Sequence, residues 1–122
     1  MVENPTILYV QTHGTDEIAK AATPFYLATA AAAMDMNVSI YFTMLGPSLL
    51  HKDSGDLTIK EGGAALSTFI DQALGIGVRL MVCQPSLDLN DLEMDDLIEG
   101  VEMIGGAAFN DMAAEADAVI SF

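Results

Sequence analysis

The chain is poor in thiols and in positive charge. It has one cysteine, Cys83, and four Lys or Arg residues against eighteen Asp or Glu, for a formal net charge of −14. A single thiol cannot form a disulfide within these 122 residues, which favours a reducing compartment. The excess of negative charge disfavours binding to nucleic-acid phosphates and to anionic lipid headgroups. It would steer a basic protein partner toward the surface, although scattered acids are equally typical of a surface that serves solubility.

Long hydrophobic runs and targeting signals are also missing. The longest run of small apolar residues, 28–34, is far shorter than the ~20 residues that a membrane span needs. The N-terminus lacks the basic stretch and apolar stretch of a secretory signal. A hydrophobic content of 52% is that of a globular chain, and this length fits one domain with a real core. We therefore expect a single soluble, cytoplasmic domain over residues 1–122, with no membrane or nucleic-acid partner.

What is present is a regular alternation of short apolar runs and helical patterns. Strands are predicted at 6–10, 38–43, 78–82, 101–104 and 118–122. Helices are predicted at 16–34, with a kink or a restart at Pro24, and at 64–74, 92–99 and 107–116. This alternation predicts the α/β class, as a three-layer α/β/α sandwich with a mainly parallel five-stranded sheet. The segment 44–63 has weak periodicity, and a loop of that length is usually functional, mobile or an interface.

Cys83 falls where a buried strand gives way to a loop. In open parallel sheets ligands gather at the carboxyl ends of the strands. Backbone N–H groups of the turn and of a following helix would favour the thiolate, a nucleophile or sulfur acceptor. Pro85 fixes the backbone near the turn, and Ser86 or Asp88 can cap a short helix. The loops expected at the same edge are 11–15, 43–48, 83–90 and 105–106.

The alternative for Cys83 is a structural role. Free cysteine is among the most buried residue types and packs as a small hydrophobe. The acidic segment 88–99 would also raise the thiol pKa if its carboxylates lay close to the sulfur. The reactive and the structural interpretation of Cys83 both stay open at this point. The pKa of the thiol distinguishes them.

Both histidines are weaker candidates. His13 follows the first strand and is a candidate general base or thiolate partner, or else a turn histidine that faces solvent. His51 and Lys52 form a polar pair that can bind an anion or can simply be solvated. Two distant histidines and one cysteine have no metal-ligand spacing, so we expect no metal site.

Two further kinds of site find little support. The acids of 93–99 lack the glycine and the ligand pattern of a calcium-binding EF-hand loop. The glycine pairs 62–63 and 105–106 are not followed by the Lys-Ser/Thr of a phosphate loop, and no G-x-G-x-x-G motif appears. We therefore expect no cofactor.

Several short motifs run together along the chain. LMVCQPSLDL occupies 80–89, DLIEGV follows at 96–101, GGAAF at 105–109 and a terminal AVISF at 118–122. FTMLG at 42–46 is followed by LLHK at 49–52. Over nearly the whole length, this pattern resembles the DsrE/DsrF-like family, and most of all its single-domain sulfur-carrier branch.

The resemblance implies a three-layer α/β/α fold that forms trimers or hexamers, and it implies sulfur transfer. An acceptor cysteine of the family takes a sulfane sulfur or a thiosulfonate group and passes it on, and Cys83 matches that position. We expect His13 as a neighbour of Cys83, and Gln84 and Ser86 as substrate-binding residues. Some members have a second cysteine, which this chain lacks, so its thiol would need an external acceptor thiol.

The leading hypothesis is thus a cytoplasmic, homo-oligomeric sulfur carrier, with a sulfur-donor or acceptor protein as its partner. Whether it is an enzyme stays open; if active, it is sulfur-transferase-like. The alternative is a non-catalytic oligomeric binding or assembly module of the same fold, with a structural cysteine. A flavodoxin-like ligand-binding domain is a third possibility, weakened by the absence of a phosphate-binding loop.

Overall fold

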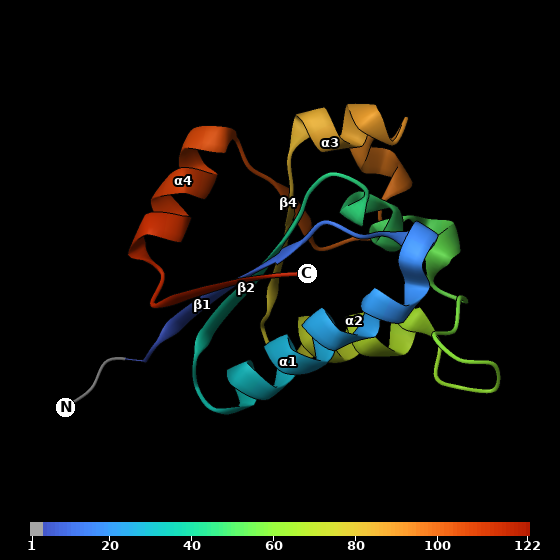
Figure 1. Cartoon of the computed structure of the whole chain (residues 1–122), viewed down its shortest axis with the longest axis horizontal. Coiled ribbons are helices and arrows are strands. Elements are labelled where there is room, and N and C mark those ends of the chain that lie inside the picture. Colours follow the sequence, from blue (N-terminus) through green and yellow to red (C-terminus); the bar gives the residue numbers. More distant parts are fainter. Residues whose placement is uncertain (1–3) are drawn as a thin grey trace.

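The computed structural model describes residues 4–122. At its centre is a five-stranded sheet with the strand order β4-β3-β2-β1-β5 (Figure 1). Every neighbouring pair of strands is parallel. The sheet confirms the predicted α/β class. The strands are β1 Thr6–Gln11, β2 Asn37–Phe42, β3 Arg79–Val82, β4 Val101–Met103 and β5 Ala118–Ser121.

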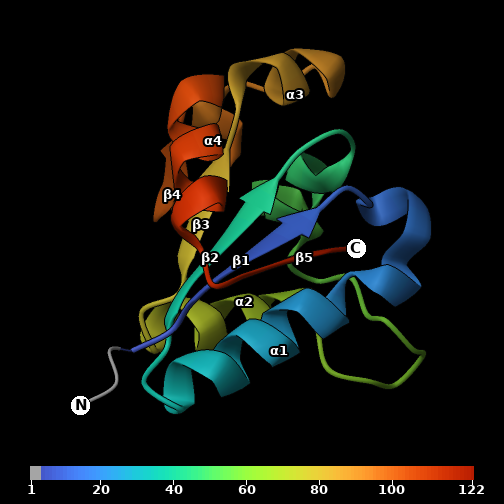
Figure 2. The ribbon, with the colours of Figure 1, turned by 60° about the vertical axis from the view of Figure 1, so that its left-hand side comes forward.

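The helices lie on both faces of this sheet. Figures 1 and 2 show α1 and α2 against one face, and α4 on the other face with α3 beside it. The α-helices are α1 Ala22–Ala33, α2 Leu66–Gly75, α3 Gln84–Leu89 and α4 Gly106–Glu115. Four 3-10 helices connect them: η1 Thr15–Lys20, η2 Gly46–Leu50, η3 Lys52–Ser54 and η4 Met94–Asp96. None of the helices within residues 4–122 has the length and apolar character needed to cross a membrane.

The larger core lies between the sheet and the pair α1 and α2. Alternate residues of the central strands point into it, among them Ile40, Phe42 and Leu80, which are fully buried. Phe25 from α1 packs on Phe42 with the ring centroids 5.7 Å apart. Burying a side chain of this size contributes roughly 1.5–3 kcal/mol, so this face supplies much of the stability.

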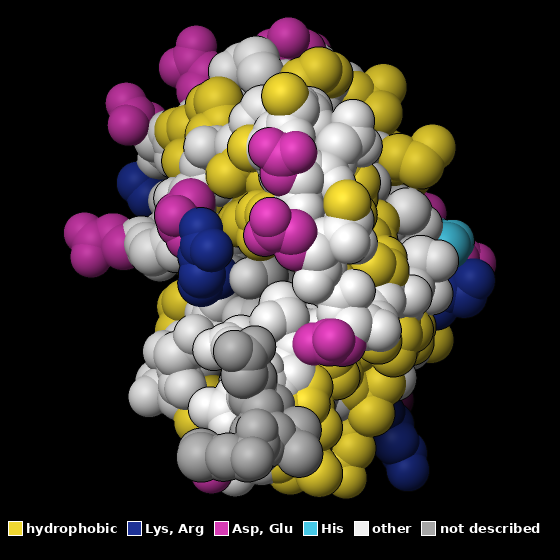
Figure 3. All heavy atoms as spheres, turned by 90° about the vertical axis from the view of Figure 1, so that its left-hand side faces the viewer, with side chains coloured by type: hydrophobic (Ala, Val, Ile, Leu, Met, Phe, Trp, Pro, Cys, Tyr) yellow, Lys and Arg dark blue, Asp and Glu magenta, His cyan; other side chains and the backbone are white. Residues whose placement is uncertain are grey.

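The opposite face of the sheet is covered by α4 and has a smaller core. Leu8, Tyr41, Met81 and Cys83 are buried there, and Phe109 of α4 packs against them. No residue of α4 is itself fully buried. The view of this side in Figure 3 shows hydrophobic side chains reaching the surface, with acidic side chains scattered among them.

Two predicted helices are wrong in part. The expected helix 16–34 is interrupted, because Glu17 has non-helical φ and ψ of −133° and 72° within η1. Pro24 lies in the first turn of α1, which is the restart and not the kink of the two alternatives, and its missing N–H removes no helical hydrogen bond there. The expected helix 92–99 is reduced to the single turn η4, and α3 follows Cys83 directly instead. The segment 44–63 contains η2 and η3.

Candidate functional site

Cys83 lies at the junction between β3 and α3. The strand ends at Val82, the helix begins at Gln84, and Cys83 is the N-cap residue with extended backbone angles. Pro85 occupies the first turn of α3, where proline favours helix initiation. The side chain is 8% exposed. It therefore sits at the carboxyl edge of the sheet, between the ends of β2 and β4.

Hydroxyl groups surround the sulfur. The Cys83 Sγ is 3.0 Å from the Ser86 Oγ and 3.9 Å from the Thr43 Oγ1. The two hydroxyls are 3.1 Å apart. The Met44 N–H donates to the Ser86 Oγ at 2.9 Å. Because Ser86 accepts from this amide and can accept from Thr43 as well, its own proton is free to point at a thiolate.

A second set of bonds fixes this network in place. Met44 has a φ of +53°, a left-handed conformation that is unfavourable for a residue with a side chain. The Asn90 Nδ2 donates to the Met44 carbonyl at 2.7 Å and to the Ser86 carbonyl at 2.6 Å. The end of α3 is thereby tied to the loop after β2. Ser86 cannot move away from the sulfur without breaking these bonds.

The surroundings favour the ionised form of the thiol. Burial raises the pKa of Cys83, but hydrogen bonds from the Ser86 hydroxyl, the Tyr41 hydroxyl, the Ser86 backbone N–H and Thr43 together outweigh it. The pKa is held below the ordinary value of 9.0. Carboxylates of the segment 88–99 are not among the causes, so the predicted opposing effect of that segment is not observed.

Tyr41 lies on β2 next to Cys83. Burial and the neighbouring thiol raise the pKa of Tyr41 well above its ordinary value of 10.0, so the phenol keeps its proton and acts as a donor. Its ring packs on Phe109 of α4 with the centroids 4.3 Å apart. The hydroxyl therefore has a fixed position beside the sulfur.

Cys83 opens onto a pocket of about 330 Å³. Tyr41 and Gln84 line the pocket beside Cys83, together with the apolar side chains of Pro85, Met103 and Ile104 and two glycines at the start of α4. The volume is enough for a small group attached to the sulfur. The arrangement combines a nucleophile, donors for its negative charge and an adjoining open pocket, which suit covalent attachment of a cargo.

The other predicted residues fall in different places. Ser86 is a direct partner of the sulfur instead of a helix cap. Gln84 is exposed at the pocket, and its amide donates to the Asp88 carboxylate at 2.8 Å. No hydrogen bond within residues 4–122 joins His13 to Cys83; His13 contacts the Glu17 carboxylate at 3.1 Å instead. The expectation that His13 is a neighbour is not supported, because β2 separates the strands that lead to the two residues.

His51 belongs to a different part of the surface. Its Nδ1 accepts from the Asp53 N–H at 2.9 Å. With Lys52 it lines a separate cavity of about 390 Å³ between η3 and α2. Among residues 4–122, no three His, Cys, Asp or Glu side chains are grouped as they would be to hold a metal ion.

The sequence analysis missed Tyr41 and Thr43. Tyr41 lies on β2 and Thr43 directly follows that strand, in the loop 43–48 expected at this edge, but nothing local marked either residue as a partner of Cys83 forty or more residues away. The signal that would have found them is strand pairing. Tyr41 pairs with Met81 in the β2–β3 register, and side chains alternate along each strand, so Tyr41, Thr43 and Cys83 share one face.

Comparisons with known proteins identify the family of the chain. A sequence model of the DsrE/DsrF-like family matches residues 6–122. The uncharacterized protein MJ0760 of Methanocaldococcus jannaschii is 28% identical over 103 residues, 84% of this chain but 38% of that protein. The chain thus spans well under half the length of MJ0760. The sulfur carrier protein DsrE2 of Allochromatium vinosum is 26% identical over 134 aligned positions, covering 77% of this chain and 84% of that protein.

Two solved structures share the fold. The protein of unknown function MTH1491 from Methanobacterium thermoautotrophicum has a TM-score of 0.66 at 17% identity. The ychN protein from E. coli has a TM-score of 0.66 at 15% identity. Each match covers 98% of this chain and 100% of the other chain. At such low identity these likenesses establish the architecture alone.

Proposed function

The chain belongs to the DsrE/DsrF-like family, and from that premise we propose that it is a sulfur carrier that accepts a sulfane sulfur or a thiosulfonate group on Cys83. The observation that carries the proposal is the thiol itself, with a pKa held below its ordinary value at the wall of a pocket large enough for the cargo. The similarity to the sulfur carrier DsrE2 supports the same class of role.

Loading is a nucleophilic displacement at sulfur. The Cys83 thiolate attacks the outer sulfur of a donor persulfide, a new S–S bond forms, and the donor thiolate leaves with the electron pair of the broken S–S bond. Ser86 and Tyr41 donate hydrogen bonds to the attacking thiolate, which raises its population at neutral pH. The same donors lie within reach of the sulfur after it becomes a persulfide.

Unloading requires a thiol from outside these residues. Cys83 is the sole cysteine of the 122 residues, so no second thiol of this sequence can attack the persulfide. The acceptor thiolate attacks the outer sulfur, and the Cys83 thiolate leaves, stabilised by the donors that favoured it at the start. A low-pKa thiol is also a good leaving group, so one environment serves both steps.

The remaining parts of the proposal concern assembly and location. We assign the carrier to a reducing compartment such as the cytoplasm, where a free thiol persists. We expect a homo-oligomer, a trimer or hexamer, because apolar side chains such as Val119 and Met103 are 47% and 43% exposed on the edge strands. A sulfur-donor or acceptor protein with a basic surface suits the net charge of −14.

The test is intact mass after incubation with a low-molecular-weight persulfide. The proposal predicts a gain of one sulfur atom in the wild type and none in Cys83→Ser. Reduction with a dithiol should reverse the gain. An unchanged wild-type mass, or an adduct that persists in Cys83→Ser, contradicts the proposal.

One observation favours the alternative, a binding or assembly module with a structural cysteine. Cys83 is 8% exposed and packs with Leu8 and Met81. That role predicts a thiol with an ordinary or raised pKa, and therefore slow alkylation at neutral pH. The pH dependence of alkylation by iodoacetamide separates the two functions, since the carrier requires a midpoint below that of a free thiol.

A further inference from the structure

Among residues 4–122, no positively charged side chain lines the pocket beside Cys83. Its polar side chains are those of Tyr41, Cys83 and Gln84, and the Gln84 amide is already bound to the Asp88 carboxylate. The rest of the lining is hydrocarbon or backbone. A group with a fixed negative charge would therefore enter this pocket without a cationic side chain to meet it.

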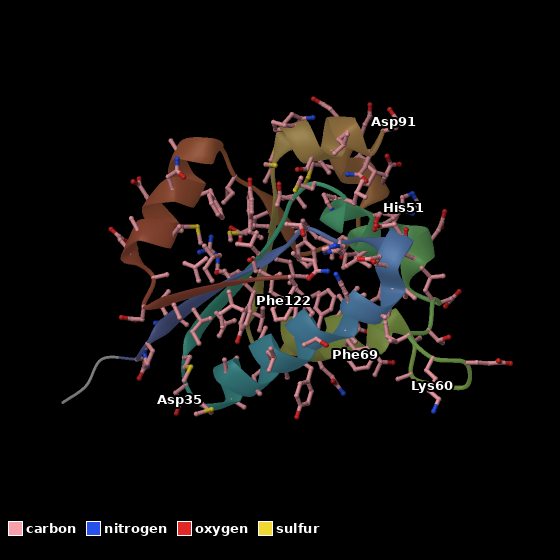
Figure 4. The ribbon with its side chains drawn as sticks, in the orientation of Figure 1. Asp35, His51, Lys60, Phe69, Asp91 and Phe122 are labelled. Atoms are coloured by element: carbon pink, nitrogen blue, oxygen red, sulfur yellow. The ribbon has the colours of Figure 1, made fainter. Side chains whose placement is uncertain are left out.

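The four basic residues of the chain are all placed elsewhere. Arg79 lies at the amino end of β3, at the opposite edge of the sheet from Cys83, and donates twice to Glu102 at 3.0 and 3.1 Å. Lys20 is 3.3 Å from the Glu17 carboxylate. Lys52 lines the separate cavity beside His51. Lys60 projects from the loop before α2, on the side of the molecule away from α3 and α4 (Figure 4).

The remaining positive potential in the wall is that of the first turn of α3, which already faces the sulfur, and that of the first turn of α4. Helix α4 begins at Gly106, with Gly105 as N-cap residue and no side-chain cap. A helix terminus amounts to about half a charge, and it acts here within a protein of net charge −14. A persulfide sulfur already has the Ser86 and Tyr41 donors at hand, whereas the three oxygens of a sulfonate have no ionic partner.

We propose that this pocket selects the cargo: Cys83 accepts sulfur from persulfide donors, and the uncharged, apolar wall disfavours groups that end in a sulfonate, such as thiosulfonate. The inference rests on the proposed function and chooses between its two cargoes. Moving an ionised sulfonate from water into a pocket without a counter-charge is costly.

The two loading reactions differ in what stays on the protein. With a persulfide, Cys83 gains one sulfur atom and the donor leaves as a thiolate. With tetrathionate, the Cys83 thiolate would attack an inner sulfur, thiosulfate would leave with the bonding electron pair, and an S2O3 group would remain on Cys83. Neither reaction needs an added oxidant or reductant. Intact mass therefore identifies which has occurred.

The experiment compares cysteine persulfide and tetrathionate as donors. Each rate of Cys83 modification is divided by the rate of N-acetylcysteine with the same donor, which removes the intrinsic reactivity of the donor. We expect the normalised rate with the persulfide to exceed that with tetrathionate by about tenfold or more. Equal normalised rates would overturn the inference and leave the proposed function standing. Failure of both donors to modify Cys83 would overturn the proposed function itself.

Two variants localise the effect. Met103 lines the pocket and is 43% exposed, and Met34 is 67% exposed at the carboxyl end of α1, away from Cys83. Met103→Arg should raise the ratio of tetrathionate rate to persulfide rate by about tenfold, because it adds a cation at the pocket. Met34→Arg adds the same charge and should leave that ratio unchanged. An equal rise in both variants would show that net charge discriminates, and would overturn the assignment to the pocket.

Discussion

The two faces of the sheet have different compositions and different tasks. Toward α1 and α2, β2 and β3 direct the apolar side chains of Val38, Ile40, Phe42, Leu80 and Val82. Toward α4 the same strands direct Ser39, Tyr41, Arg79 and Met81, and Cys83 follows on that face. Helices α1 and α2 pack on the first face and α4 packs on the second (Figure 2). The larger apolar core lies on one side of the sheet and Cys83 lies on the other.

This division explains how a protein of 122 residues can hold polar groups in its interior. Thr43 and Ser86 hydrogen-bond each other and the sulfur, and the Tyr41 hydroxyl is directed at the sulfur, so each hydroxyl of the network has a partner. The apolar face supplies the free energy that holds β2 and β3 in register. The position of the donors around Cys83 thus depends on packing on the far side of the sheet.

The largest expected effect tests that dependence on packing. Phe25→Ala removes a fully buried ring from the α1 side, and should lower the free energy of unfolding by about 3–5 kcal/mol. Phe109→Ala removes the same number of atoms from the α4 side, where the ring is half-buried, and should cost roughly half as much. Urea unfolding of the two variants measures the difference. Equal losses of unfolding free energy in the two variants would show that the two faces contribute equally to stability.

Ser86→Ala should lower stability and raise the thiol pKa through a local change on the α4 face of the sheet. It removes the acceptor of the Met44 N–H and the main side-chain donor to Cys83, at a cost of about 1–3 kcal/mol. The thiol pKa should rise, so alkylation near neutral pH should slow several-fold. The pH profile of the alkylation rate checks this. An unchanged midpoint would show that Ser86 does not lower the thiol pKa.

Tyr41→Phe is a more conservative change at the same site. The ring contact with Phe109 is retained and the hydroxyl donor is lost, so stability should change by less than about 1.5 kcal/mol. The thiol pKa should rise by less than in Ser86→Ala, because Tyr41 is the smaller of the two influences. A rise in the thiol pKa larger than that in Ser86→Ala would show that Tyr41 is the stronger of the two donors.

The ionisation of Cys83 and Tyr41 should also shape the pH dependence of stability. The folded chain holds the thiol pKa below 9.0, so it releases the proton before the unfolded chain does. The free energy of unfolding should therefore rise as pH increases from the folded pKa toward 9.0, and this gain is lost as pH falls back through the folded pKa. Tyr41 acts in the opposite sense, because its pKa is raised in the folded chain. Its contribution to the free energy of unfolding is present below pH 10.0 and is lost as the pH rises above that value. In Cys83→Ala the pH dependence due to the thiol should vanish and the pH dependence due to Tyr41 should remain. Urea unfolding at a series of pH values measures both.

The smallest expected effect concerns His13. Its ring contacts Glu17 and the Thr12 hydroxyl, on the loop after β1. His13→Ala should leave the alkylation rate of Cys83 within about twofold of the wild type, because strands spaced about 4.8 Å apart put β2 between the two residues. A strong fall in the rate would restore His13 as a partner of the thiol.

The sequence predicts the fold well because apolar runs and helical patterns are local signals. All five strands form close to their expected bounds, and Cys83 follows β3 as expected. The predicted helix 92–99 was wrong although its apolar residues do face the core: Leu97 is buried, but the segment forms only the single turn η4, and Pro85 at a first-turn position starts α3 earlier. The donors Tyr41 and Thr43 were missed because they reach Cys83 through strand order, which no local pattern encodes.

The most direct test of the central claim is a complete carrier cycle with labelled sulfane sulfur. The protein is loaded from a labelled low-molecular-weight persulfide, freed of donor, and mixed with excess acceptor thiol, and the label and the intact mass are followed. The account predicts one labelled sulfur on Cys83, its passage to the acceptor, and return of the protein to its unmodified mass. Label that stays on the protein, or that is found at any residue other than Cys83, would contradict it.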